Sequence, residues 1–251
     1  MREEHESFIE NEFRECVERT IDRLGSEDTH RPFHAALLSE QALFWSRFER
    51  SFSTSFGQRV IEQVSRIAAE AGGAQIAQTQ KETTVTLSSA KLAAIEEHMA
   101  GLRAGRNLAT PDWESTLAEL ATIRPEREMQ TIRVISDLWW QRGGINHYMS
   151  IKTVKPNIDQ TAEAKRDMLK LKLADPKAEV YFGLYYNPYG VNRADYAWSP
   201  PQRIFNMATD RSVLIGKDYW DALGGAGFYE ELLAVAERVG RQTRKRIGAL
   251  R

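Results

Sequence analysis

The sequence has almost no cysteine and no long apolar run. Cys16 is the single cysteine among 251 residues, which excludes an intramolecular disulfide framework and is typical of a reducing cytoplasm. No window approaches the roughly 20 apolar residues that a membrane-spanning helix needs. The acidic residues 1–6 lack the apolar stretch of a signal peptide. We therefore expect one globular domain over residues 1–251, located in the cytoplasm and not bound to a membrane.

Charge is nearly balanced overall but unevenly distributed along the chain. The formal net charge is −1, and apolar and charged residues make up 42% and 27% of the sequence, as in ordinary globular proteins. Residues 152–251 carry 17 basic and 12 acidic side chains, whereas residues 1–151 carry 17 basic and 23 acidic ones. A basic second half is suited to phosphate contacts, and the first half is expected to face solvent or a second subunit.

A predicted β-hairpin carries the most informative pattern. A run rich in β-branched residues leads to Asp137, a Gly-Gly turn follows at 143–144, and a second alternating run carries Ser150 and Lys152. With the glycines at the tip, Asp137 lies across from Met149 and Ser150. Ser150 and Lys152 share one face because they are two residues apart. The hairpin is therefore expected to place a carboxylate beside a lysine, with a hydroxyl between them.

This arrangement is suited to hydrolysis of phosphodiester bonds. Mg²⁺ prefers oxygen ligands, and Asp137 supplies one carboxylate while the carbonyl of Ile151 offers a possible second ligand. A bound Mg²⁺ polarises a phosphate and lowers the pKa of an attacking water, and Lys152 can orient that water or stabilise developing charge. Surface hairpins routinely carry such residues, so the pattern alone also fits an exposed turn without chemistry.

The first part of the chain, residues 1–125, is expected to be mostly helical. Helical spacing of apolar residues predicts helices over 3–24, 33–48, 58–71, 90–104 and 112–123, and a short strand over 83–87. The polar stretch 49–57 is expected to be a loop that feeds the next helix. Such a loop can bind phosphate through backbone N–H and hydroxyl groups, although a plain helix cap would use the same residues.

The second part, residues 126–251, is expected to hold the hairpin and a recognition region. Further elements are predicted as a helix over 158–173, strands over 179–185 and 213–215, and a closing helix over 228–239. A loop over 187–202 is long for a compact domain. This loop and the residue after it carry side chains that can form paired hydrogen bonds to adenine or guanine, namely Asn192, Arg193, Gln202 and Arg203. The alternative is a rigid loop that packs Tyr196 and Trp198 on the body.

Four segments resemble the TdeIII family of type II restriction endonucleases. They are Glu49–Gln58 (ERSFSTSFGQ), Ile151–Thr161 (IKTVKPNIDQT), Tyr186–Gly190 (YNPYG) and Leu214–Gly225 (LIGKDYWDALGG). The likeness implies an α/β fold of the PD-(D/E)XK nuclease kind, with a mixed central β-sheet flanked by helices and an N-terminal helical part. It also implies Mg²⁺-dependent cleavage of double-stranded DNA at a short palindrome, GGNCC for this family. A homodimer and a cognate DNA methyltransferase are the expected partners. Within the second and third of these segments, the likeness adds DNA-contact candidates: Lys155, Asn157, Gln160, Asn187 and Tyr189.

One departure from that superfamily concerns the acid that usually precedes x-Lys. Ser150 stands in its place, so a second metal-binding carboxylate must come from elsewhere. Glu49 is the first candidate because it lies in a family-like segment and an early helix often presents a Glu to the metal. Glu163 is the second and Glu62 the third. Glu163 belongs to an acidic stripe that is equally typical of a solvated helix face.

Two other functions remain open from the sequence. The chain could be a less specific nuclease of the same fold that serves repair or recombination. It could also be a DNA-binding module that has lost cleavage, since Ser150 removes a carboxylate.

Overall fold

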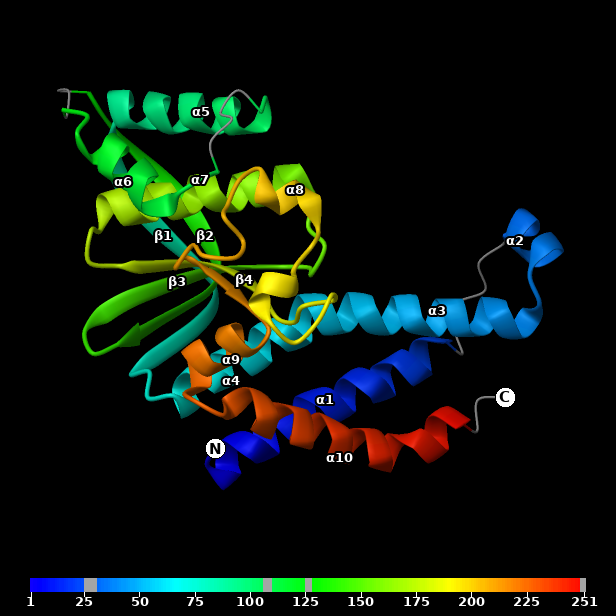
Figure 1. Cartoon of the computed structure of the whole chain (residues 1–251). Helices are drawn as coiled ribbons and strands as arrows, with labels where there is room; N and C mark the ends of the chain where they lie inside the picture. Colours follow the sequence, from blue (N-terminus) through cyan, green and yellow to red (C-terminus); the bar gives the residue numbers. More distant parts are fainter. Residues whose placement is uncertain (25–30, 106–109, 125–127, 249–251) are drawn as a thin grey trace.

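A five-stranded mixed sheet lies at the centre of the computed structural model, with helices on both of its faces (Figure 1). The structure describes residues 1–24, 31–105, 110–124 and 128–248. The strands are β1 (Ile76–Ser88), β2 (Met129–Arg142), β3 (Ile145–Lys152), β4 (Glu179–Leu184) and β5 (Val213–Ile215). The α-helices are α1 (Glu3–Leu24), α2 (Pro32–Leu37), α3 (Glu40–Ser55), α4 (Ile61–Ala71), α5 (Ser89–Arg103), α6 (Trp113–Ala121), α7 (Ile158–Ala174), α8 (Ser199–Gln202), α9 (Lys217–Gly224) and α10 (Phe228–Gly248). The mixed α/β fold expected from the sequence is confirmed.

The strands lie in chain order across the sheet. β1, β2 and β3 are antiparallel, and β3, β4 and β5 are parallel, with α7 as the crossover from β3 to β4. The predicted turn forms at Gly143 and Gly144, whose φ values of 59° and 75° favour glycine. β1, which comes from the first part of the chain, pairs along β2, so both parts of the chain share one sheet.

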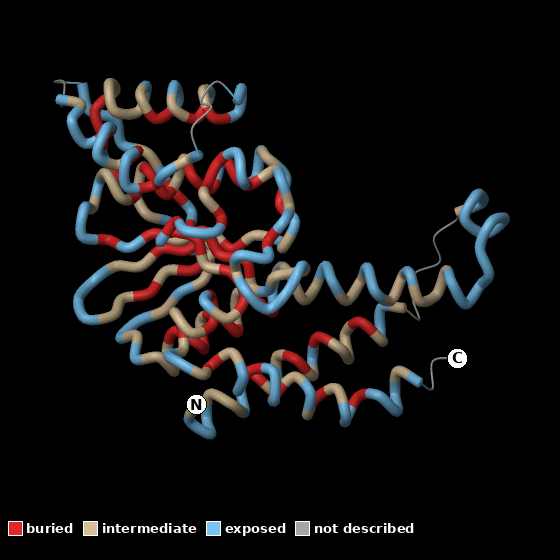
Figure 2. Tube along the Cα trace, viewed as in Figure 1, coloured by how far each residue is buried: buried red, intermediate tan, exposed pale blue. Residues whose placement is uncertain are grey.

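Two hydrophobic cores fill the spaces between the sheet and its helices (Figure 2). Helices α5, α6 and α7 cover one face, whose core includes Ile95, Met168 and Phe182. Helices α1, α4, α9 and α10 cover the other face, whose core includes Val64 and Trp220. Within the described residues, no helix is long and apolar enough to span a membrane.

Halfway along β1 and β2, the side chains at alternate positions change from one of the two cores to the other. On β2, Val134 belongs to the α7-side core, whereas Leu138 belongs to the α4-side core. Residues four apart on a regular strand share a face. β1 behaves in the same way, with Val85 on the α7 side and Ala77 on the α4 side. The alternation of both strands is therefore irregular between these positions, and Asp137 lies in the irregular part of β2.

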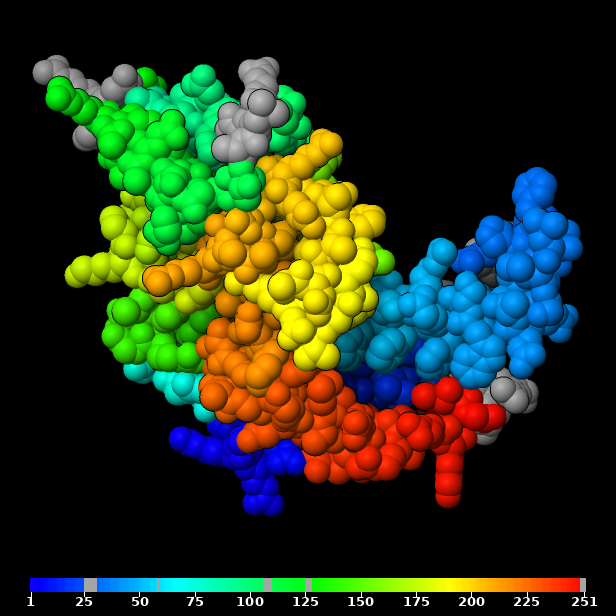
Figure 3. Space-filling view, viewed as in Figure 1, coloured from blue at the N-terminus to red at the C-terminus, as the bar shows by residue number. Residues whose placement is uncertain are grey.

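The N-terminal helices differ from the prediction at two places. The expected helix 33–48 is broken into α2 and α3, and Ser39 caps α3 by accepting a hydrogen bond from Ala42 N–H. The stretch 49–58 is not a loop. It belongs to α3 and to the single π-helical turn Phe56–Val60, which joins α3 to α4. Together α2 and α3 form an arm that projects from the body (Figure 3).

Candidate active site

Asp137 lies where β2 and β3 separate. The pairing of the two strands runs from the turn to Leu138 and Met149 and stops there. Beyond that pair, the backbone N–H of Ile151 donates to Asp137 Oδ2 at 2.7 Å. The carboxylate thus takes the place of a ladder partner, which satisfies an amide that the separation would leave unpaired.

Ser150 and Lys152 converge on the same carboxylate oxygen. The Ser150 hydroxyl donates to Asp137 Oδ2 at 3.3 Å and Lys152 Nζ at 3.1 Å. The Asp137 and Lys152 side chains are 21% and 22% exposed, so the pair is partly shielded yet open to a ligand. This carboxylate, hydroxyl and lysine were predicted together from the sequence, and the structure places them within hydrogen-bonding distance.

A hollow of about 310 Å³, here the Asp137 hollow, opens between this group and α7. Asp137, Ser150 and Lys152 line one side, and Glu163 and Asp167 line the other. Asp167 pairs with Lys170 of its own helix. Among the described residues, Glu163 forms no ion pair or side-chain hydrogen bond, and it is exposed. Its carboxylate is therefore available to a ligand that enters the hollow.

A second acid approaches from α4. Gln80 Nε2, on β1, donates to Glu62 Oε2 at 2.9 Å and lies 3.5 Å from Asp137 Oδ1. Burial raises the pKa of the Glu62 carboxyl and the charge of Asp137 raises it further, whereas the Gln80 bond and Lys152 lower it. Glu62, ranked third from the sequence, is thus electrostatically coupled to Asp137. Gln80 was not singled out, because nothing in the polar stretch around it signals a site.

Glu49, ranked first from the sequence, lies elsewhere. It is exposed in the middle of α3, where it accepts a hydrogen bond from Ser53 one turn later. Glu49 does not line the Asp137 hollow, and the helix α3 that carries it projects from the body (Figure 1). The backbone N–H of Ile151 donates to Asp137, and the Ile151 carbonyl as a metal ligand stays a prediction.

The predicted DNA-contact residues at the start of α7 have structural partners. Asn157 and Gln160 form a capping box, in which the side chain of each accepts from the backbone N–H of the other. Lys155 is exposed, with Nζ 5.2 Å from the centre of the Tyr189 ring and 5.7 Å from that of Trp198. Lys155 thus presents its charge at the surface beside two aromatic rings.

The 187–202 segment is fastened to the body rather than free. The Tyr196 hydroxyl donates to the Val154 carbonyl at 2.9 Å, and Trp198 Nε1 donates to the Pro156 carbonyl at 2.8 Å. Asn187 Nδ2 donates to the Asn192 carbonyl within the segment. The packing alternative considered for this segment is therefore observed, and the segment holds a 3₁₀ turn at Arg193–Asp195 and the short helix α8.

The Arg193 guanidinium is already hydrogen-bonded within the protein. Its Nε donates to the Met207 carbonyl at 2.7 Å, and its Nη2 donates to the Asp210 carbonyl at 2.6 Å. The guanidinium braces two backbone segments, because a half-buried arginine is stable only when its donors are satisfied. Two of the guanidinium nitrogens are thus occupied within the protein, and base reading by Arg193 stays a prediction.

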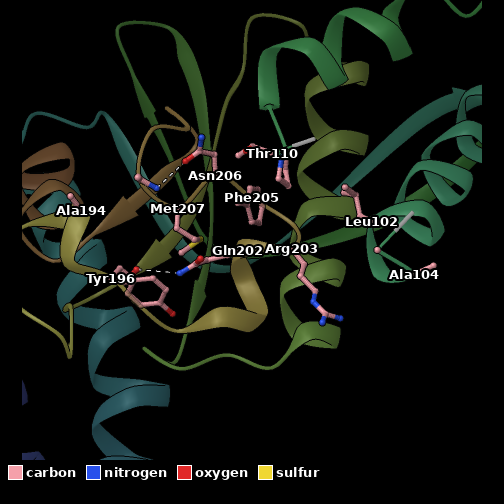
Figure 4. Close-up of a pocket in the computed structure, with 13 residues that line it drawn as sticks. Leu102, Ala104, Thr110, Ala194, Tyr196, Gln202, Arg203, Phe205, Asn206 and Met207 are labelled. Carbon is pink, nitrogen blue, oxygen red and sulfur yellow. Dashed lines mark hydrogen bonds between the residues drawn. The ribbon is translucent and has the colours of Figure 1, made fainter. Parts of the chain in front are cut away.

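Gln202 and Arg203 border a separate cavity of about 640 Å³ (Figure 4). Gln202 Nε2 donates to the Tyr196 carbonyl at 3.3 Å, while the exposed Arg203 side chain extends away from that contact (Figure 4). Phe205 and Asn206 line the cavity as well. None of the residues around Asp137 lines this cavity, so it is distinct from the Asp137 hollow.

The donor set around Asp137 is compatible with a divalent cation. The part of the chain that the structure describes holds no group of three or more His, Cys, Asp or Glu residues arranged for a metal. Mg²⁺ does not need such a cage, since it commonly binds one or two carboxylates together with water and substrate phosphate. Asp137 with either Glu163 or Glu62 provides that number of carboxylates beside a lysine.

Comparison with known proteins agrees over nearly the whole chain. A family model described as "Type II restriction endonuclease, HinfI" matches residues 1–240. The type II restriction enzymes HgiEI and HgiBI of Herpetosiphon aurantiacus are 29% and 27% identical over 249 residues, which cover 93% of this chain and 89% of each relative. HgiCII of the same organism is 27% identical over 229 residues, covering 89% of this chain and 82% of the relative. No solved structure matches the chain. The chain belongs to the HinfI family of type II restriction endonucleases.

Proposed function

We propose that the chain hydrolyses phosphodiester bonds of double-stranded DNA at a short palindromic site, with Mg²⁺ as cofactor and Asp137 and Lys152 in the active site. The observation that carries the proposal is the contact of 3.1 Å between Lys152 Nζ and Asp137 Oδ2 at the point where two strands part. A carboxylate and an ammonium on rigid strands meet the need for fixed geometry in a catalytic site.

The three polar side chains have separate roles in this proposal. Asp137 Oδ2 already accepts three donors, whereas Oδ1 accepts one long contact of 3.5 Å from Gln80, so Oδ1 is the oxygen with room for a cation. Mg²⁺ at this place would polarise the phosphate and lower the pKa of the attacking water. Lys152 stabilises negative charge that develops on the phosphate. Ser150 keeps the Asp137 carboxylate in its rotamer through the hydroxyl hydrogen bond.

Glu163 and Glu62 replace Glu49 as the proposed second acid. Glu163 lines the Asp137 hollow and forms no ion pair or side-chain hydrogen bond among the described residues. Glu62 is tied to the site through Gln80. Glu163→Gln and Glu62→Gln are each expected to raise the Mg²⁺ concentration needed for half-maximal cleavage, whereas Glu49→Gln serves as the matched control and leaves it unchanged. A shift of equal size in Glu49→Gln would contradict this assignment.

The narrower features stay proposals that rest on the likeness to the TdeIII family. They are the PD-(D/E)XK nuclease fold, the recognition sequence GGNCC and a cognate DNA methyltransferase. Action in the cytoplasm likewise stays a prediction from the sequence. The antiparallel β1–β2–β3 unit with acids on β2 and on the flanking helices α4 and α7 supports the fold assignment.

The protein is further proposed to act as a homodimer whose subunits contact each other through the arm. Neither α2 nor α3 has a buried residue, and Phe33 and Leu37 are 80% and 82% exposed. The chain also offers an apolar hollow of about 360 Å³ between α1, α3 and α10, lined by Phe48 and Val239 among others. An apolar tip and an apolar hollow on one chain are self-complementary, and a two-fold dimer matches a palindromic site.

Light scattering coupled to size-exclusion chromatography tests the dimer. Leu37→Asp is expected to convert a dimer of the wild-type chain to a monomer, because a buried charge at the tip opposes association. Phe8→Asp is the control, since Phe8 is 55% exposed on α1, outside the arm. A wild-type monomer, or a dimer that survives Leu37→Asp, would refute the arm as the interface.

Cleavage of plasmid DNA tests the function as a whole. With Mg²⁺, the wild-type chain is expected to give discrete fragments, and Lys152→Ala to give none while still binding DNA in a gel shift. A smear would instead favour a less specific nuclease of the same fold. A gel shift of wild-type protein without any cutting would favour a DNA-binding module that has lost cleavage.

A further inference from the structure

Gln80 has an unusual backbone conformation. Its φ of 50° makes it the single non-glycine residue with positive φ in the described ranges. Residues with a β-carbon rarely adopt this region, and those that do are often found at functional sites. A strained conformation in the middle of a strand persists only where the surrounding structure holds it.

The position of Gln80 relates this conformation to the active site. The flanking residues Thr79 and Lys81 pair with Leu138 and Ser136 of β2, while Gln80 itself, opposite Asp137, is missing from the pairing. The faces of both strands also exchange around this level, as the two cores show. The conformation of Gln80 therefore interrupts the β1–β2 ladder beside the Asp137 carboxylate.

The side chain of Gln80 joins two carboxylates that come from different elements. Its Nε2 donates to Glu62 Oε2 at 2.9 Å and lies 3.5 Å from Asp137 Oδ1. A carboxamide carries two N–H donors on this nitrogen, so it can serve both acids at once. Asp137 Oδ1 is the oxygen that the Lys152, Ser150 and Ile151 donors leave free. Two like charges would otherwise repel each other across this gap.

We propose that Gln80 is a positioning residue that holds the Glu62 and Asp137 carboxylates together as one divalent-cation site. This inference rests on the proposed nuclease function and goes beyond it, because it assigns a role to a residue outside the acid–lysine set. The backbone conformation directs the amide toward the two acids, and the amide keeps them close before a cation binds. Loss of the amide weakens cation binding, since groups that orient ligands commonly contribute about 10–100-fold to metal affinity.

Cation titrations of Gln80→Ala and Gln80→Gly test this role. Binding of Mn²⁺ is followed by electron paramagnetic resonance without DNA, and cleavage is followed over a range of Mg²⁺ concentrations. Both variants are expected to need about tenfold more cation in both assays, with cleavage recovering at high Mg²⁺. Gln80→Gly is expected to unfold at a higher temperature than Gln80→Ala, because glycine adopts positive φ without strain. Gln78→Ala, two residues earlier on the exposed side of β1, is the matched control and keeps wild-type titrations.

The outcomes separate this inference from the proposed function. Titrations of both Gln80 variants that superimpose on the wild type would overturn the positioning role, even with Asp137→Asn inactive. An Asp137→Asn variant that cuts at the wild-type rate would overturn the proposed function itself. Combining Gln80→Ala with Glu62→Gln gives a third check. If the double variant needs no more cation than either single variant, Gln80 acts through Glu62. If the increases in the cation requirement are fully additive, this role is refuted.

Discussion

Substitution of Asp137 is expected to separate a structural role from a catalytic one. Its Oδ2 accepts from the buried Ile151 N–H at 2.7 Å as well as from Lys152 and Ser150. Asp137→Ala leaves that N–H without its partner, which costs about 1–3 kcal/mol. Loss of the contact with the partly exposed Lys152 adds little, since such pairs contribute about 0–1 kcal/mol. We expect a destabilisation of about 2 kcal/mol, or roughly 4–8 °C in Tm for a chain of this size.

Asp137→Asn retains an oxygen for the Ile151 N–H but removes the negative charge. We therefore expect its Tm to stay within about 2–4 °C of the wild type, which corresponds to a loss below about 1 kcal/mol. Cleavage is expected to fall by at least about 10³-fold, because loss of cation-assisted stabilisation of several kcal/mol changes the rate by about tenfold per 1.4 kcal/mol. Thermal unfolding and plasmid cleavage measure the two effects. An Asp137→Asn enzyme within tenfold of the wild-type rate would refute the catalytic assignment, and a fully stable Asp137→Ala would refute the structural one.

Three further substitutions test other parts of the structure. Arg193→Met is expected to cost about 2–3 kcal/mol in urea unfolding, because two backbone carbonyls lose a charged donor. Its DNA affinity should fall equally for specific and random DNA, and a loss confined to specific DNA would support Arg193 as a base reader. Burial, and then the Arg142 charge, lowers the pKa of His147 in the folded chain to about 4. As the pH falls from about 6.5 to 4, the unfolded chain therefore binds a proton that the folded chain does not, and the Tm of the wild type falls. His147→Phe removes this group and is expected to reduce that fall in Tm. An unchanged pH profile would contradict this. Gly183→Ala should cost about 1–3 kcal/mol in urea unfolding, as its Cβ would lie 2.6 Å from Tyr219 Cε2 and 2.8 Å from Met149 Sδ, and a wild-type midpoint would contradict the packing.

The hairpin and its three polar residues were predictable because they depend on local rules. Two glycines specify the turn, and the two-residue period of a strand then fixes which side chains face each other. These rules place Asp137 across from Ser150 once the turn is known. Asp112 was likewise predictable as a helix cap, and it accepts from the Ser115 N–H at 2.7 Å.

The stretch 49–58 was mispredicted because packing outweighed local propensity. Its serines, threonine and glycine favour caps and turns over helix interiors. In the structure, Phe52 and Phe56 stack at 5.2 Å between ring centres, and Phe56 stacks on Phe13 of α1 at 5.7 Å. These aromatic contacts hold the segment helical, so Glu49 lies on α3 and not in a loop.

The ranking of Glu49, Glu163 and Glu62 from the sequence did not include their placement in space, because proximity to a motif does not specify the direction of a side chain. A right-handed crossover is the rule for parallel strands joined by a helix, and it brings α7 back over the face of β3 that carries Ser150 and Lys152. Glu163 thereby lines the same hollow as Asp137. The order of elements was predicted, but the rotation of α7 about its axis, which decides whether Glu163 or Asp159 faces the hollow, depends on tertiary packing. Asp159 instead pairs with Arg103 of α5.

The location of the site follows from a defect in the sheet. Where β2 leaves β3, Asp137 supplies the acceptor that the ladder loses, and Gln80 interrupts the ladder on the other side of the same strand. In a regular sheet at this level, the backbone N–H of Ile151 would pair with a backbone carbonyl of β2, and the Asp137 carboxylate would have no part in the ladder. The irregularity instead leaves Oδ2 fixed by three donors and Oδ1 directed toward Gln80 and Glu62. Repair of the strand pairing would therefore be expected to stabilise the sheet while removing the opening that a cation and a phosphate need, which is the balance between stability and activity expected at a strained site.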